Sequence, residues 1–252
     1  FIMSENQKKV WITGASSGIG KAVAEKFAKE GWNVAVSARR KEVLEKMTSD
    51  KNIFSFPLDV TNKDKCEAAF NEIITKFKKI DICIFCSGTY DPKKEQEINV
   101  DQIKYVMDVN YFGVINCVKT VEKYFKEKKE GQISIVSSIA GYRGLPNSSG
   151  YGPSKAALTN FTESIYFDFK KFNVNISVIS PGFIKTPLTD KNDFSMPFLK
   201  SPEYAARVIY NGLIKNKSFE IHFPKSLTLI LKFLRILPYK IYLFLVDKLV
   251  KR

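Results

Sequence analysis

Residues 13–20 read TGASSGIG, and this stretch decides the fold class. The apolar run 9–12 precedes it, and Ile19, Val23 and Phe27 follow at helical spacing. A glycine-rich turn therefore joins a strand to the N-terminus of a helix. Glycines at such a turn let the backbone approach a pyrophosphate, and the helix N–H groups favour the anion. We expect a dinucleotide site, because an ordinary strand-to-helix turn needs one glycine, or two at most.

Apolar runs typical of strands alternate with amphipathic helical patterns along the first 223 residues. This alternation predicts an α/β fold: one doubly wound parallel sheet of the Rossmann type, with helices on both faces. A hydrophobic content of 44% in 252 residues suffices for one such domain over residues 1–225, followed by a tail over 226–252. The expected strands are 8–13, 33–38, 52–57, 81–86, 132–137, 174–179 and 218–223. The expected helices are 18–30, 40–49, 62–78, 101–127, 150–171 and 202–215.

Residues 151–155 read YGPSK, which places Tyr151 and Lys155 four residues apart in a predicted helix. Side chains at this spacing share one helix face. A lysine ammonium nearby favours the phenolate and should lower the tyrosine pKa from its usual value near 10. The pair could then exchange a proton near neutral pH. Such pairs are common by chance on helix surfaces, so the interpretation depends on the glycine-rich turn upstream.

Together these motifs resemble those of the short-chain dehydrogenase/reductase family, from about residue 8 to about residue 223. The family's catalytic serine lies thirteen positions before its tyrosine, its catalytic asparagine lies in a helix, and a Pro-Gly pair follows its sixth strand. The matching catalytic residues are Asn110, Ser138, Tyr151 and Lys155. The implied cofactor-binding residues are Gly14, Ser16, Ser17, Gly18, Ile19, Gly20, Arg39, Arg40, Asp59, Val60, Gly88, Lys155, Pro181, Gly182 and Thr186.

The resemblance implies an oxidoreductase that moves a hydride between a nicotinamide and a carbonyl or alcohol. Ser138 would donate a hydrogen bond to the substrate oxygen, and Tyr151 would exchange a proton with it. Lys155 would lower the tyrosine pKa and bind the nicotinamide ribose, and Asn110 would hold a water that connects Lys155 with solvent. Ser137 competes with Ser138, and the thirteen-residue offset favours Ser138. For Asn110, a helix kink or a buried core amide stays an alternative.

The end of the second predicted strand bears on the choice of cofactor. An acidic residue there would bind the ribose 2′-hydroxyl of NAD, whereas arginine accommodates a 2′-phosphate. Ala38 takes the acidic position, and Arg39 and Arg40 follow it. Guanidinium groups pair well with phosphate oxygens, so we expect NADP(H) rather than NAD(H). The alternative is that the two arginines merely begin a solvated helix. Asp59 matches the family position that contacts the adenine ring.

The chain departs from the family at residues 85–88, which read FCSG where Asn-Asn-Ala-Gly is usual. Gly88 is kept, so the backbone can still approach the cofactor, but the stability of this turn is in question. The substrate pocket is expected from residues 140–147, Phe183 and residues 188–200. Their apolar and aromatic side chains suit a small hydrophobic carbonyl or alcohol, and they would equally suit a packed lid.

Composition argues against several other kinds of site. His222 is the single histidine, which excludes a histidine triad and a zinc site, so no metal is expected. Cys83 and Cys86 lie in a predicted strand, where residues three apart point to opposite faces, and are expected to be buried. The net charge of +14 attracts anions, but no nucleic-acid motif accompanies it. The polar segment after Met3 carries no secretory signal, which favours a cytoplasmic protein.

The tail over 226–252 combines apolar residues with interspersed charges and a proline, Pro238. No apolar run approaches the roughly 20 residues of a spanning helix. Two basic amphipathic helices hinged at Pro238 fit better, and they would lie on an anionic membrane, join a homo-oligomer or cap the substrate pocket. Other functions therefore stay open. A cofactor-binding sensor or regulatory protein would be expected to lose Tyr151 or Lys155. A membrane-recruited interaction module would depend on the tail, and an epimerase or dehydratase is a further enzymatic alternative.

Overall fold

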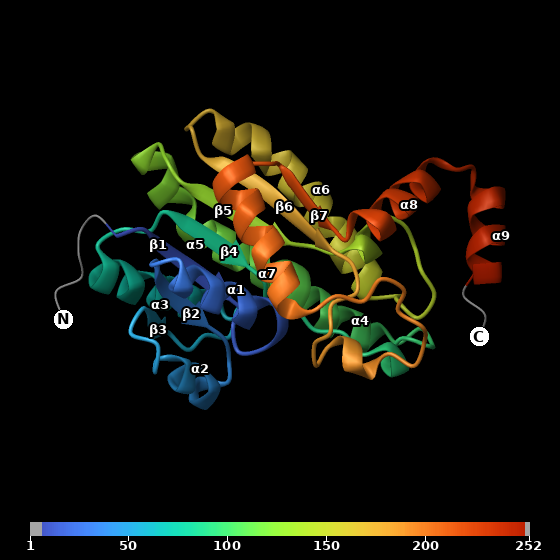
Figure 1. Ribbon diagram of the computed structural model, residues 1–252, viewed down its shortest axis with the longest axis horizontal. Helices are drawn as coiled ribbons and strands as arrows, with labels where there is room; N and C mark the ends of the chain where they lie inside the picture. The colour runs from blue at the N-terminus through green and yellow to red at the C-terminus, as the bar shows by residue number, and fades with distance from the viewer. Residues whose placement is uncertain (1–6, 250–252) are drawn as a thin grey trace.

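The computed structural model describes residues 7–249 around one sheet of seven parallel strands (Figure 1). Strand β1 pairs with both β2 and β4, so the sheet runs β3-β2-β1-β4-β5-β6-β7 and its direction of winding reverses at β1. Ligands bind outside the carboxyl ends of strands at such a reversal. The strands are Lys9–Thr13 (β1), Asn33–Ser37 (β2), Ile53–Ser55 (β3), Ile82–Phe85 (β4), Gln132–Val136 (β5), Asn175–Pro181 (β6) and Glu220–Phe223 (β7). The predicted Rossmann-type fold is confirmed.

Helices cover both faces of the sheet, because successive strand residues alternate between two apolar clusters. Val10 and Ile12 of β1 pack in one cluster with helices α1 and α7, whereas Trp11 packs in the other with α3, α5 and α6. Both clusters consist of nearly solvent-free aliphatic and aromatic side chains. The helices are Gly18–Lys29 (α1), Lys41–Met47 (α2), Lys63–Phe77 (α3), Val100–Met107 (α4), Gly113–Lys128 (α5), Tyr151–Lys170 (α6), Pro202–Asn211 (α7), Lys225–Ile236 (α8) and Tyr239–Leu249 (α9).

The single helix predicted over 101–127 is wrong in one respect, because a π-helical turn at Asp108–Phe112 separates α4 from α5. In this turn the Gly113 N–H donates to the Asp108 carbonyl, five residues earlier, instead of four. A Cβ built at Gly113 would lie 2.6 Å from Val60 Cγ2, so glycine lets α5 begin close to the segment between β3 and α3. Asn110 lies in the middle of the widened turn, which agrees with the helix-kink alternative.

The tail forms two helices, α8 and α9, that meet at Pro238 as expected. Pro238 accepts the first backbone hydrogen bonds of α9 from Ile241 and Tyr242. Residues 250–252 of the predicted tail lie outside the described part of the chain. Within residues 7–249, none of the helices has both the length and the apolar character needed to cross a bilayer.

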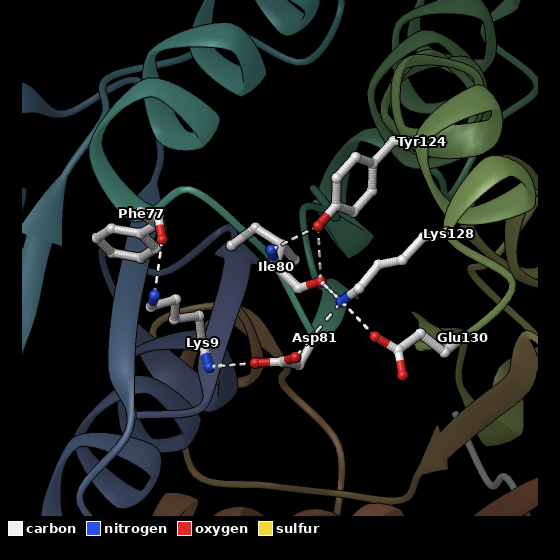
Figure 2. A network of polar contacts seen from close by, with 7 residues as sticks. All are labelled: Lys9, Phe77, Ile80, Asp81, Tyr124, Lys128 and Glu130. Carbon is white, nitrogen blue, oxygen red and sulfur yellow. Dashed lines mark hydrogen bonds and ion pairs between the residues drawn. The ribbon is translucent and has the colours of Figure 1, made fainter. Parts of the chain in front are cut away.

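A polar network stabilises the amino-terminal edge of the sheet, opposite the edge where ligands bind (Figure 2). The Lys9 N–H donates to Asp81 Oδ2 at 2.8 Å, and Lys9 Nζ donates to the Phe77 carbonyl at 2.7 Å. Lys128 Nζ lies 3.5 Å from Asp81 Oδ1 and therefore connects the end of α5 with the start of β4. The network joins β1, α3, β4 and α5 without using any residue of the predicted site.

Candidate active site

A cavity of about 430 Å³ opens at the carboxyl ends of the central strands, next to the reversal at β1. It brings together motifs that are as much as 170 residues apart in the sequence. All predicted cofactor-binding residues line it, and so do three of the four predicted catalytic residues. These lining residues are Gly14, Ser16, Ser17, Gly18, Ile19, Gly20, Arg39, Arg40, Asp59, Val60, Gly88, Ser138, Tyr151, Lys155, Pro181, Gly182 and Thr186.

The glycine-rich turn has a shape that side chains would prevent. Gly14 has φ of 67°, and a Cβ there would lie 2.7 Å from the Cys86 carbonyl oxygen. A Cβ at Gly20 would lie 2.4 Å from the Gly14 carbonyl oxygen. The turn therefore folds closely against β4 and aims the N-terminus of α1 into the cavity. The first turn of α1 carries no acidic residue, and its N-cap Ser17 does not cap it, so its N–H groups suit a pyrophosphate.

Arg40 reaches across the cavity to the glycine-rich turn. Its Nη2 donates to Ser16 Oγ at 2.8 Å and to Ser17 Oγ at 2.9 Å, and its Nε donates to Ser16 Oγ at 3.2 Å. Arg39 and Arg40 are both exposed. A guanidinium group held beside the phosphate-binding turn adds positive charge where the adenosine half of a dinucleotide would bind.

Thr13 stabilises the turn at residues 85–88, where the family's two asparagines are missing. The Cys86 N–H donates to Thr13 Oγ1 at 3.2 Å. Cys86, Ser87 and Gly88 all line the cavity, so this segment keeps its place beside the site. Cys83 is fully buried as predicted, whereas Cys86 is only half-buried because it faces the cavity.

Tyr151 and Lys155 lie in the first turns of α6, and burial determines how both titrate. The Lys155 side chain is only 4% exposed, its Nζ donates to the Val136 carbonyl at 2.9 Å, and burial lowers its pKa to about 8. Burial raises the pKa of Tyr151 to about 12, against the opposing effect of a hydrogen bond with Ser138. The expectation that Lys155 lowers the tyrosine pKa is therefore wrong for this structure. Lys155 Nζ is directed at a backbone carbonyl, 5.7 Å from the tyrosine ring centroid, and desolvation disfavours both charged forms.

The two serines after β5 have different surroundings. Ser138 hydrogen-bonds the Tyr151 phenol, and its Oγ accepts from the Ala140 N–H at 3.2 Å. Ser137 Oγ instead donates to the Lys155 carbonyl at 2.7 Å and shares a 2.9 Å hydrogen bond with Thr159 Oγ1. Ser137 therefore holds β5 against α6, and Ser138 is the serine directed at the tyrosine.

Asn110 is fully buried and lies behind the cavity rather than in its lining. Its Oδ1 accepts from the Thr89 N–H at 2.6 Å, and its Nδ2 donates to the Thr89 carbonyl and to Ser154 Oγ, each at 3.0 Å. A Cβ at Gly88 would lie 3.5 Å from both Asn110 Oδ1 and Lys155 Nζ. Asn110 and Lys155 therefore flank the same backbone position. The water contact expected of Asn110 stays a prediction.

Two residues near Tyr151 were not identified from the sequence. The ring centroid of Tyr90 lies 4.6 Å from that of Tyr151, and its hydroxyl donates to the Asn147 carbonyl at 2.9 Å. Glu95 Oε2 accepts from the N–H groups of Gly150 at 2.9 Å and Tyr151 at 3.0 Å, which caps the N-terminus of α6. Glu95 is 3% exposed, and among residues 7–249 its Oε1 has no hydrogen-bond partner. No local pattern marks this cap, because 55 residues separate it from the helix.

The predicted substrate pocket is only partly correct. Leu188, Thr189 and Lys191 line the cavity, and Phe183 packs against Phe194 with ring centroids 5.9 Å apart. Ile139, Tyr142, Arg143 and Leu145 instead pack against the tail. In particular, the Tyr142 hydroxyl donates to Glu220 Oε1 at 2.6 Å, and Leu145 lines a small crevice with α8 and α9. Because these side chains contact the tail, they do not line the cavity.

Comparisons with known proteins agree with this geometry. The family described as short chain dehydrogenase matches residues 8–195. Dehydrogenase/reductase SDR family member 7 of Mus musculus is 34% identical over 76% of this chain and 60% of its own length. The 3-dehydrosphinganine reductase of Danio rerio is 30% identical over 83% of this chain and 69% of its own length.

The solved structure of ElxO with NADP bound superposes with a TM-score of 0.76 at 27% identity, covering 86% of this chain and 97% of that one. The matched family spans the glycine-rich turn, the YGPSK motif and the strands between them. The protein is thus an oxidoreductase acting on CH–OH or C=O groups with a nicotinamide cofactor. The chain belongs to the short-chain dehydrogenase/reductase family.

Proposed function

We propose that the protein is an NADP(H)-dependent reductase or dehydrogenase of a hydrophobic carbonyl or alcohol, with Tyr151 as its general acid and base. The observation that carries this proposal is the convergence of Ser138, Tyr151 and Lys155 on a cavity that also contains the glycine-rich turn. A cofactor-binding sensor would need the turn alone. The hydrogen bond between Ser138 and the tyrosine phenol supports a proton-transfer role, which a sensor would not require.

The bound cofactor supplies or accepts the hydride. The chain's own residues bind and orient: the turn at 13–20 holds the pyrophosphate, and Ser138 donates a hydrogen bond to the substrate oxygen. With a pKa near 12, Tyr151 keeps its phenolic proton at neutral pH, which is the state that can protonate a carbonyl being reduced. Lys155, with a pKa near 8, is mostly cationic at pH 7, and its proposed role is to bind the nicotinamide ribose.

The preference for NADP(H) rests on Arg39 and Arg40. Arg40 is already hydrogen-bonded to both serines of the glycine-rich turn, so its guanidinium is held near the adenosine ribose with little freedom left to lose. A planar guanidinium group pairs well with phosphate oxygens. ElxO, whose solved structure contains NADP, is 27% identical to this chain, which supports the same choice.

The hydrophobic substrate class rests on Leu188, which lines the cavity, and on exposed aromatic side chains in the loop that follows it. Phe194 is 37% exposed, and Phe198 in the same loop is 46% exposed, so an apolar substrate could cover them. A relative with 30% identity carries the name 3-dehydrosphinganine reductase, which supports a ketone with a long apolar chain as the first candidate.

The cofactor preference is tested by Arg40→Ala, with Arg207→Ala as the matched control, because Arg207 is an exposed arginine on α7 away from the cavity. Losing a charge-assisted contact costs roughly 1.5–3 kcal/mol, so we expect NADPH binding to weaken about 10-fold to 150-fold. NADH binding should change about twofold or less. Dissociation constants come from fluorescence titration of both cofactors. Equal losses for NADPH and NADH would remove the basis for the proposed preference.

A further inference from the structure

Helix α8 has two apolar faces, of which only one is covered. Its inner face packs on the domain through Leu227, Leu231 and Leu234. The opposite face consists of large apolar side chains with half or more of their surface exposed: Leu229 (57%), Ile230 (50%), Phe233 (60%) and Ile236 (77%). Helical spacing places these four on one side. A helix inside a single domain has no need for a second apolar face.

Helix α9 lies beyond the far end of α8, away from the sheet (Figure 1), and carries further exposed apolar side chains. Tyr239, Ile241, Leu243 and Phe244 are between 49% and 76% exposed. Together, the two helices carry eight of the sixteen large apolar side chains that are exposed within residues 7–249. Such a concentration on one short segment marks an interaction surface. We call these eight residues of α8 and α9 the tail surface.

Contacts with the loop after Ser138 attach both helices of the tail surface to the domain. Arg143 Nη1 donates to the carbonyls of Leu234 at 3.0 Å and Leu237 at 2.7 Å, at the end of α8. Its guanidinium lies 4.0 Å from the ring centroid of Tyr242 in α9, whose hydroxyl donates to the Gly144 carbonyl at 2.6 Å. One arginine therefore fixes both helices to the loop that follows Ser138.

Charge decides between the possible partners. Residues 225–252 contain a single acidic residue, Asp247, beside seven basic ones: Lys225, Lys232, Arg235, Lys240, Lys248, Lys251 and Arg252. A second copy of this chain would bring the same excess of positive charge to the contact and be repelled, and the whole chain carries a net charge of +14. An anionic lipid surface complements both the apolar side chains and the basic ones.

We propose that α8 and α9 form a preformed platform that docks the enzyme on an anionic bilayer without crossing it. The apolar side chains of the tail surface enter the boundary between headgroups and acyl chains, and the lysines other than Lys232, which pairs with Glu220, remain among the headgroups. Because α8 follows β7 directly, the platform lies at the sheet edge that also carries the cavity. An apolar substrate dissolved in the membrane would then reach the cavity from the docked side.

The test is co-sedimentation of the full chain with vesicles of phosphatidylcholine, with and without phosphatidylserine. We expect binding to the phosphatidylserine vesicles, which weakens as salt rises. The double variant Phe233→Ser with Ile236→Ser should reduce partitioning at least about tenfold. Its matched control is Phe167→Ser, because Phe167 on α6 is equally exposed at 67% and should not contribute. If the double variant melts at a lower temperature than the unaltered protein, the single variant Ile236→Ser replaces it in the binding measurement.

The basic contribution is tested separately. Lys240→Glu with Lys248→Glu should weaken binding to phosphatidylserine vesicles at least about tenfold, since each lysine near an anionic surface contributes about fivefold. Lys46→Glu with Lys65→Glu changes the net charge equally on exposed positions elsewhere and should have little effect.

No binding by the unaltered chain, or equal losses in variants and controls, would overturn the proposal. Light scattering that shows a dimer dissociating in the Phe233 variant, without any vesicle effect, would assign the surface to a second copy. These measurements need no substrate, so they are independent of the proposed reductase activity.

Discussion

The buried charge of Lys155 is expected to lower the unfolding free energy of the protein. Replacing Lys155 by methionine measures the size of this effect. Burial lowers the lysine pKa from 10.5 to about 8. In the unfolded chain the amine holds its proton up to about pH 10.5, so between these pH values the unfolded state binds more protons. The unfolding free energy of the unaltered protein should therefore rise as the pH rises from about 8 to about 10.5. Below pH 8 the protein lacks this gain in stability. Each pKa unit corresponds to 1.36 kcal/mol, which gives about 3 kcal/mol in total.

Lys155→Met removes the buried charge but also leaves the Val136 carbonyl without its 2.9 Å partner. An unsatisfied buried acceptor costs about 1–3 kcal/mol. At pH 7 we expect the variant to be more stable than the unaltered protein by about 1 kcal/mol, while turnover is lost. The difference should reverse in sign by pH 10 as the lysine of the unaltered protein becomes neutral.

The assay is urea unfolding of the cofactor-free protein, followed by circular dichroism at several pH values between 7 and 10. Lys46→Met is the control, because it makes the same chemical change at an exposed position. The difference in unfolding free energy between Lys155→Met and the unaltered protein should change by about 2–3 kcal/mol over this range. A difference that stays constant with pH would refute the depressed pKa and the reasoning built on it.

Three further predictions follow from the contacts around the site. Glu95→Ala should lower both the unfolding free energy and kcat, because two N–H groups at the start of α6 lose their acceptor, at a cost of about 1–3 kcal/mol each. Glu95→Gln should keep most of the stability and most of kcat, and equal losses in the two variants would exclude the capping role. Asp81→Ala should lower the unfolding free energy by about 1–3 kcal/mol with cofactor affinity unchanged, and a weaker affinity would contradict the separation of the two sheet edges. Gly20→Ala should weaken cofactor binding at least about tenfold, measured by titration, because its Cβ would lie 2.4 Å from the Gly14 carbonyl; unchanged affinity would mean that the turn adapts.

Much of the fold and the site could be predicted because local patterns determine them. The glycine-rich turn lies where predicted, since its backbone shape requires small residues at Gly14 and Gly20. The offset that favours Ser138 over Ser137 agrees with their hydrogen bonds, because successive residues of an extended segment point to opposite sides. The meeting of these motifs at one sheet edge follows from the parallel topology.

The features that could not be predicted depend on contacts between distant segments. The break in the helix around Asn110 comes with hydrogen bonds to Thr89 and Ser154, which no periodicity in the sequence records. The raised pKa of Tyr151 arises from burial, which spacing along a helix does not determine. Likewise, Tyr142 looked like a pocket residue, but its hydroxyl bonds Glu220 beneath the tail.

The tail connects these observations to function. Arg143 and Tyr142 lie in the loop that follows Ser138, and both are engaged by or beneath α8 and α9. A partner that binds the tail surface would therefore contact two helices that themselves pack on the segment after Ser138.

The most direct test of the central claim is turnover by Tyr151→Phe. NADPH consumption is followed by absorbance with a panel of hydrophobic ketones, for the unaltered protein and the variant, and NADPH affinity is measured in parallel. If the phenol is the proton donor, kcat should fall by about 10² to 10⁴ with the best ketone, while NADPH affinity changes about twofold or less. A variant that keeps more than about a tenth of the original kcat would contradict the assignment of Tyr151 as general acid.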